Sequence, residues 1–142
     1  MAQQMTNEEY RSFMIDRTRT AVLATVRVDG GPRAAPIWFD LDGEICWCSR
    51  PESTVKGRNM RRDARVSQCI DEEEPPFHFV LIEGAADLTA GDPDLLYWAT
   101  RIGGRYMGPG RAEEYGSRNA VEGELLVRMM PQKIVAYKNV SD

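Results

Sequence analysis

Two short turns that contain glycine divide the first third of the chain and restrict it to antiparallel β-structure. Asp29-Gly30-Gly31 follows a run of β-branched and apolar residues, and Asp42-Gly43 separates two further runs of similar character. Asp-Gly pairs readily adopt the positive φ angles that two-residue hairpin turns require. We therefore expect three strands, at residues 20–28, 33–41 and 44–49, to form an antiparallel meander.

Helical patterns stand between and after these strands. Thr6 and Glu9 have capping-box spacing, which predicts a helix over residues 7–18. Ser53 or Thr54 can cap a second helix that runs to about Asp63. A third helix should start at 92–94, with Asp92 as N-cap, and a short polar helix should cover 111–119. The apolar stripe of the third helix consists of Leu95, Trp98, Ala99, Ile102 and Tyr106.

The later β-segments complete the predicted architecture. They lie at residues 65–70, at 77–89 with a bulge or bend at Gly84, and in a last segment of two parts, 124–130 and 133–137, kinked at Pro131. Six β-segments with short helices favour a closed or nearly closed antiparallel barrel. A doubly wound parallel sheet is disfavoured because no G-x-G-x-x-G follows a strand. The 142 residues are expected to form one domain, 1–142.

Charge and hydropathy exclude several classes of protein. A net charge of −4 and a pI near 5.1 argue against a nucleic-acid partner, whose phosphates call for excess Lys and Arg. No apolar run approaches the roughly 20 residues that cross a bilayer. The polar N-terminus lacks the apolar segment of a secretion signal, so we expect a cytoplasmic protein without membrane contact.

Cysteine and histidine do not point to a metal centre. Cys46 and Cys48 are two residues apart in a predicted strand and there is no C-x-x-C pair, so we interpret them and Cys69 as packing thiols. His78 is the only histidine, and we interpret it as a half-buried strand residue. There is also no Ser-His-Asp, Cys-His or paired-carboxylate pattern. We therefore predict no metal site and no catalytic side chain.

One segment, residues 33–62, combines features of a phosphate-binding site. A flat heterocycle could lie on the backbone of residues 34–38, and the following strand ends at Cys48-Ser49. The next helix begins near Ser53 and carries Lys56 early, and free helix amides with hydroxyls and cations attract phosphate. Four basic residues in seven positions fit a solvated helix face equally well, so spacing leaves both interpretations open. These four are Lys56, Arg58, Arg61 and Arg62.

The order of these features resembles the pyridoxamine 5′-phosphate oxidase-like split β-barrel family over nearly the whole chain. Residues 54–66 fit the pattern S/T-x-K-x-x-N-[LM]-R-R-D-x-R-V. The stretch 105–128, with R-Y-M-G, R-A-E-E-Y-G-x-R-N and G-E-L-L-V-R, is similar to the subgroup that uses the 5-deazaflavin coenzyme F420 rather than FMN. The resemblance implies a mainly β, six-stranded antiparallel split barrel of the FMN-binding type with short helices. It also implies a homodimer with the cofactor in the groove between protomers.

The resemblance also implies which residues contact the cofactor. Lys56 would bind its phosphate, the strand at 36–38 would lie against its ring, and late-helix residues would reach the partner's cofactor. Val55 replaces a second basic residue of the oxidases, which favours F420 over FMN. The implied cofactor-binding residues are Arg33, Pro36, Ile37, Trp38, Cys48, Ser49, Thr54, Lys56, Arg58, Asn59, Tyr106, Met107 and Arg118.

The implied activity is transfer of a hydride from reduced F420 to a conjugated small-molecule acceptor, quinone-like or a tetrapyrrole such as biliverdin. The cofactor then performs the chemistry while the protein positions it and excludes water. Two alternatives stay open: an FMN-dependent oxidoreductase, and a non-enzymatic F420-, flavin- or haem-binding protein with His78 as the haem ligand.

Large aromatic side chains support the expected homodimer, because their number exceeds the need of one small barrel and aromatic residues favour interface cores. They are Trp38, Phe39, Trp47, Tyr97 and Trp98.

Overall fold

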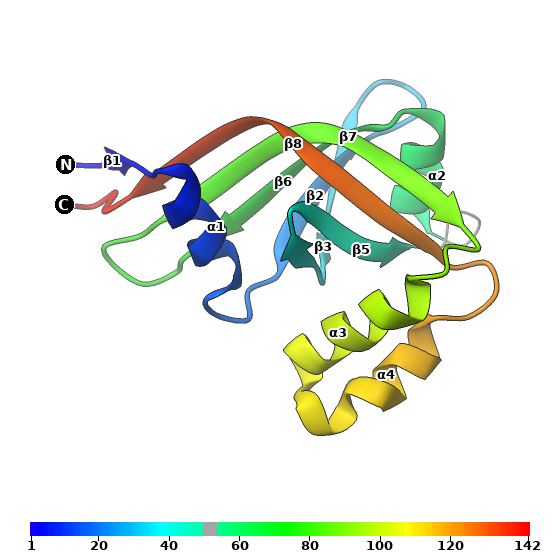
Figure 1. Ribbon diagram of the computed structural model, residues 1–142. Helices are drawn as coiled ribbons and strands as arrows, with labels where there is room; N and C mark the ends of the chain where they lie inside the picture. The colour runs from blue at the N-terminus through cyan, green and yellow to red at the C-terminus, as the bar shows by residue number, and fades with distance from the viewer. Residues whose placement is uncertain (50–53) are drawn as a thin grey trace.

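A computed structural model describes residues 1–49 and 54–142, with only the backbone described for residues 44, 46, 48 and 49. Its main feature is one curved antiparallel sheet in the order β3-β2-β6-β7-β8-β5-β4, with β1 paired to β8 (Figure 1). Six strands are long and two, β1 and β4, are short. The strands are β1 (Gln3–Gln4), β2 (Ala21–Val26), β3 (Pro32–Ile37), β4 (Asp40–Asp42), β5 (Glu44–Ser49), β6 (Arg65–Asp71), β7 (Phe79–Ala90) and β8 (Leu125–Lys138). The predicted mainly β, antiparallel split-barrel class is confirmed.

The predicted strand at 33–41 is divided in two, and this division rolls the sheet into a barrel. Phe39 and Asp40 are consecutive and both buried, at 0% and 6% exposure, whereas side chains alternate between faces in a flat strand. The chain therefore turns after β3. β3 pairs with β2, β4 pairs with β5, and β5 pairs with β8. Both predicted hairpins are confirmed, and the predicted three-stranded meander is wrong.

A β-bulge crosses the longest strand pair, β7 with β8. The register shifts between Glu83 and Gly84, because Glu83 faces Lys133 while Gly84 faces Pro131. A Cβ at Gly84 would lie 2.7 Å from the carbonyl oxygen of Met130, so glycine permits this close approach. The predicted bulge is confirmed. The predicted kink at Pro131 does not divide the strand, since proline is tolerated where a bulge interrupts the ladder.

The helices begin mostly where capping residues predict. α1 (Asn7–Ile15) has the predicted capping box, in which the Thr6 and Glu9 side chains each accept from the other's backbone N–H at 3.1 Å. It ends three residues earlier than predicted. α2 (Val55–Arg62) is capped by Thr54, whose Oγ1 accepts from the Gly57 N–H at 3.1 Å.

The start of α3 (Leu95–Met107) differs from the prediction by two residues. Its N-cap is Asp94, whereas the Asp92 carboxylate accepts from the Asp94 N–H at 2.8 Å in a turn before the helix. A 3₁₀ turn, η1 (Pro109–Arg111), leads into α4 (Ala112–Asn119). α3 and α4 pack together as a hairpin below the barrel (Figure 1).

The barrel interior holds the main core, and it takes most of the aromatic side chains expected at an interface. Trp47 and Phe39 are 0% exposed, and Trp98 packs with Leu126 in a second cluster. Three of the five aromatic residues therefore serve the protomer's own packing. His78 is half-buried as predicted, but it directly precedes β7 instead of lying in the strand, and its Nδ1 accepts from the Asn139 N–H at 3.0 Å.

Candidate functional site

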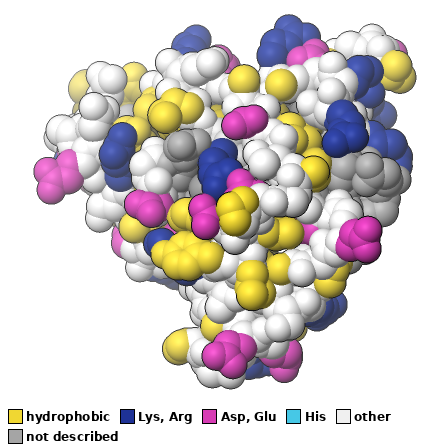
Figure 2. Space-filling model, turned by 45° about the vertical axis from the view of Figure 1, so that its right-hand side comes forward, with side chains coloured by type: hydrophobic (Ala, Val, Ile, Leu, Met, Phe, Trp, Pro, Cys, Tyr) yellow, Lys and Arg dark blue, Asp and Glu magenta, His cyan; other side chains and the backbone are white. Residues whose placement is uncertain are grey.

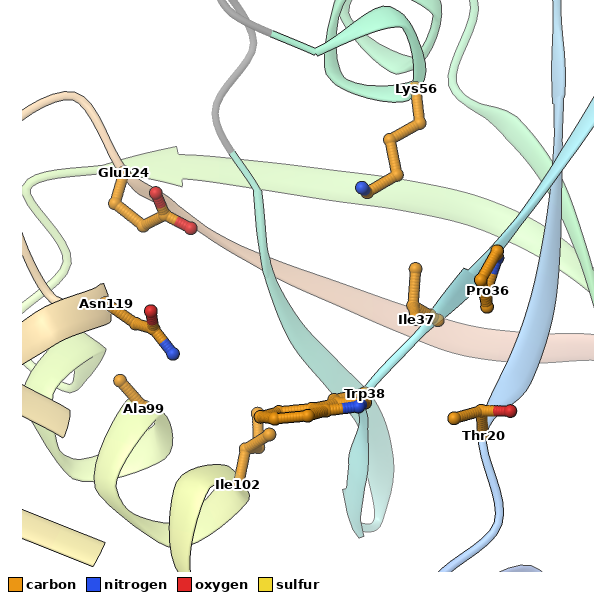
Figure 3. A pocket seen from close by; sticks show the side chains of 9 residues that line it. All are labelled: Thr20, Pro36, Ile37, Trp38, Lys56, Ala99, Ile102, Asn119 and Glu124. Atoms are coloured by element: carbon orange, nitrogen blue, oxygen red, sulfur yellow. The ribbon is translucent and has the colours of Figure 1, made fainter. Parts of the chain in front are cut away.

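A hollow of about 420 Å³ opens between the barrel and the α3–α4 hairpin (Figure 3). Its walls come from the loop before β2, the end of β3, the first turn of α2, α3 and the segment between α4 and β8. Distant parts of the chain therefore meet in one place. The lining residues are Thr20, Pro36, Ile37, Trp38, Lys56, Ala99, Ile102, Asn119 and Glu124.

The cationic end of the hollow is the Lys56 side chain, which points into it from α2 (Figure 3). Lys56 is the second residue of α2, two positions after the Thr54 cap, so it stands in the first turn of the helix, at the positive end of the helix dipole. Arg58, Arg61 and Arg62 of the same helix are exposed. Basic side chains also gather at the upper right of Figure 2. An ammonium beside a helix N-terminus suits an anionic group such as phosphate.

The opposite end is an aromatic and aliphatic wall at the end of β3. Pro36, Ile37 and Trp38 line it, and Trp38 lies at its base (Figure 3). Trp38 is 36% exposed, and its ring stacks on Tyr106 with centroids 5.0 Å apart and an interplanar angle of 2°. Such a wall suits the face of a planar heterocycle. Four predicted site residues, Lys56 included, thus meet in one hollow.

Five lining residues were not predicted as site residues. Ala99 and Ile102 belong to the apolar stripe predicted for α3, and both are buried. Asn119 is the last residue of α4, and Glu124 directly precedes β8; both point into the hollow from the side opposite β3 (Figure 3). Thr20 completes the rim. Asn119 and Glu124 fall within the motifs of residues 105–128 that resemble the F420 subgroup. A place in a motif does not tell which way a side chain points, and only the packing of the helix hairpin brings these residues to the hollow.

Other predicted residues lie outside the lining. Asn59 is 4% exposed, its Nδ2 donates to Thr25 Oγ1 at 3.1 Å and its Oδ1 accepts from Arg62 at 3.0 Å. Its amide therefore joins α2 to β2, and Asn59 is not among the lining residues. Arg58 is exposed on α2, and Arg33 is half-buried on β3.

The late-helix residues are tied within their own chain. The Tyr106 hydroxyl donates to the Arg19 carbonyl at 2.6 Å, and burial raises the pKa of this phenol. Met107 ends α3, and the exposed Arg118 lies over the Tyr115 ring at 5.2 Å. That these residues reach the cofactor of a partner protomer stays a prediction.

Three residues named in the sequence analysis are described only in part or not at all. Cys48 and Ser49 end β5 opposite Leu126 and Leu125, beside Glu124, and their side chains are not among those described. Ser53 lies outside the described residues.

The described residues, 1–49 and 54–142, also bear on metal binding and membrane insertion. No group of three His, Cys, Asp or Glu side chains there is arranged to hold a metal ion. No described helix is both long and apolar enough to span a bilayer.

Comparison with known proteins gives relatives of the same fold. A conserved hypothetical protein from Mycobacterium tuberculosis is 25% identical, with a TM-score of 0.82 over 96% of this chain and 87% of that one. An F420 reductase is 21% identical, with a TM-score of 0.66 over 87% and 94%. A haem storage protein from Vibrio cholerae is 18% identical, with a TM-score of 0.70 over 93% and 96%. These likenesses include both an enzyme and a binding protein.

The family itself follows from the sequence match. The model of the family described as pyridoxamine 5′-phosphate oxidase matches residues 6–134, which is most of the chain. This chain belongs to the pyridoxamine 5′-phosphate oxidase-like family of split β-barrels.

Proposed function

We propose that this protein is a reductase that binds coenzyme F420 in the hollow between β3, α2 and the α3–α4 hairpin. The observation that carries the proposal is the pairing of Lys56 with the Trp38 wall in a single hollow. One end offers a cation to a phosphate and the other offers a flat apolar surface to a ring. The F420 reductase among the structural neighbours supports the choice of deazaflavin.

The donor set of the hollow fits such a cofactor. Lys56 can make a charge-assisted hydrogen bond to phosphate, which is about twice as strong as a neutral one. Asn119 and Glu124 offer polar atoms on the far side, where hydroxyl or N–H groups of a ligand could be recognised. The apolar surfaces of Ala99 and Ile102 close the side toward α3.

The described residues then hold the cofactor in place and supply no reactive group of their own. Bound F420 in its reduced form supplies the hydride. Lys56 anchors the phosphate, Pro36 to Trp38 hold the ring, and the helix hairpin keeps water from one side of it. The proton that completes reduction comes from solvent. The proposed acceptor is a conjugated organic molecule, quinone-like or a linear tetrapyrrole.

A fluorescence titration tests the cofactor. Oxidised F420 added to the purified protein should quench tryptophan emission with saturation in the micromolar range, because Trp38 forms the ring wall. FMN titrated in parallel should bind more weakly. Saturable quenching by FMN without any response to F420 would reject the proposal.

Replacing Lys56 tests the phosphate end. Lys56→Ala should weaken F420 binding by about 1.5–3 kcal/mol, the contribution of a hydrogen bond between charged groups. Its unfolding midpoint in urea should match that of the wild type. Lys133→Ala is the matched control, since Lys133 is exposed on β8 and lies outside the hollow. Equal affinities of Lys56→Ala and Lys133→Ala would place the phosphate elsewhere.

Two alternatives make different predictions for the same material. An FMN-dependent oxidoreductase would purify as a yellow protein that releases flavin on denaturation. A haem-binding protein would show a Soret band that depends on His78. His78 lies in a second hollow with three acidic residues, Glu8, Glu9 and Asp16, and with Lys138, which pairs with Glu9.

A further inference from the structure

We infer that Tyr106 is a positioning residue for the ring-binding wall: it acts on a bound ring through Trp38, without touching the ring itself. This inference rests on the proposed binding of a planar cofactor in the hollow. Tyr106 lies near the end of α3 and contacts two backbone segments, at Arg19 and at Phe39.

The first observation is the aromatic stack. Trp38 lines the hollow, and Tyr106 lies parallel to it at 5.0 Å with an angle of 2°. A tryptophan that is one-third exposed at a strand end has several rotamers available. A parallel ring behind it stabilises one of them, with a contribution comparable to that of other stacked aromatic pairs.

The second observation is the position of the Tyr106 hydroxyl. It donates to the Arg19 carbonyl at 2.6 Å and accepts from the Phe39 N–H at 3.4 Å. Arg19 precedes Thr20, and Phe39 follows Trp38, and both Thr20 and Trp38 line the hollow. One hydroxyl therefore joins the backbone of two separate wall segments.

The third observation is the neighbouring arginine, which fixes the same corner. Arg105 donates to the Phe39 carbonyl at 2.5 Å and to the Met14 carbonyl at 2.9 Å. Its guanidinium lies 4.7 Å from the Phe39 ring centroid. These two hydrogen bonds hold the last turn of α3 without using the Tyr106 side chain, although the Arg105 guanidinium also lies 5.2 Å from the Tyr106 ring centroid. The helix should therefore keep its place when Tyr106 is changed.

Two substitutions separate the ring from the hydroxyl. Tyr106→Phe keeps the stack and should lower F420 affinity about 3-fold, whereas Tyr106→Leu removes the stack and should lower it about 10-fold. Tyr137→Phe is a control, because Tyr137 pairs with Phe79 on the barrel and lies outside the hollow. Wild-type affinity in Tyr106→Leu would overturn the inference.

A double-mutant cycle tests whether Tyr106 acts through Trp38. In a Trp38→Ala background, Tyr106→Leu should change F420 affinity by no more than about 3-fold, the effect of the lost hydroxyl, because the side chain that the Tyr106 ring positions is gone. In a Lys56→Ala background it should keep its full effect of about 10-fold, since the phosphate end is independent. A full effect in the Trp38→Ala background would show that Tyr106 acts by another route, and would reject the inference.

A measurement without ligand separates this inference from the proposed function. Trp38→Phe identifies the part of the near-ultraviolet circular dichroism spectrum that comes from Trp38, because that part is lost in this variant. That signal should also be lost in Tyr106→Leu and retained in Tyr106→Phe. If F420 fails to bind the wild type, the proposed function falls and the dichroism still decides the role of Tyr106. Retention of the signal in Tyr106→Leu would overturn the positioning role even where F420 binds.

Discussion

Glu72 joins the loop after β6 to the segment that leads into β2. Its carboxylate accepts from Arg19 at 2.6 Å and from Arg17 at 3.2 Å, and Arg19 also lies over the Phe13 ring at 4.2 Å. Arg19 directly precedes Thr20 on the rim of the hollow. This ion-pair cluster therefore fixes one edge of the candidate site as well as the fold.

The acid sensitivity of this cluster can be measured. The hydrogen bond from Arg19, more than any other contact, holds the pKa of Glu72 below its ordinary value. The stabilisation is therefore complete above the unfolded pKa of about 4.3 and is lost as the pH falls through the lower folded pKa. Glu72→Gln should have a lower urea midpoint than the wild type at pH 7, and the difference should shrink below about pH 4. Glu73→Gln, at an exposed neighbour, is the control; a pH-independent difference would contradict this account.

Lys56 and Asn59 show how far residue patterns reach. They stand three apart on one short helix, and family resemblance assigned both to the cofactor. Lys56 projects into the hollow, whereas Asn59 is buried against Thr25 of β2. The motif assigned both residues to the cofactor without distinguishing them, and only the orientation of α2 on the barrel places Lys56 in the hollow and Asn59 against β2.

At the scale of elements, the α3–α4 hairpin depends on small residues at its contact. A Cβ at Gly116 would lie 2.1 Å from Thr100 Oγ1 and 3.0 Å from Thr100 Cα, and one at Gly103 would lie 2.5 Å from Tyr115 Cβ. The helices approach this closely because glycine stands at both points. The same hairpin places Ala99, Ile102 and Asn119 in the hollow.

Enlarging Gly116 should therefore separate the two helices. Gly116→Ala is expected to lower the free energy of unfolding by about 1–3 kcal/mol, the usual effect of overpacking, and to weaken F420 binding as well. Urea denaturation and the fluorescence titration measure the two effects. Gly110→Ala is the control, because a Cβ there meets no atom within 4 Å. Equal stability of the two variants would refute close packing at Gly116.

At the scale of the whole molecule, we expect a homodimer. Tyr97 and Leu96 are each 56% exposed on α3, although most of the other large aromatic side chains are buried in the protomer. Light scattering at micromolar concentration should give twice the chain mass of 16.0 kDa. A mass of one chain at that concentration would contradict the dimer. The cofactor site would then consist of residues from a single protomer.

Local sequence patterns by themselves determined the turns, helix caps and bulge of this protein, because these depend on residues close together in the sequence. The Asp-Gly turns, the Thr6 and Thr54 caps and the Gly84 bulge all follow from backbone preferences over a few residues. Only the tertiary structure decided that residues 33–41 divide at Phe39. Phe39 and Asp40 are consecutive and both buried, which is possible because the chain turns there from one side of the barrel to the other. The tertiary structure likewise brought Lys56, Trp38 and Glu124 together, since those contacts are made across the chain by the closing of the sheet and the packing of α3 and α4.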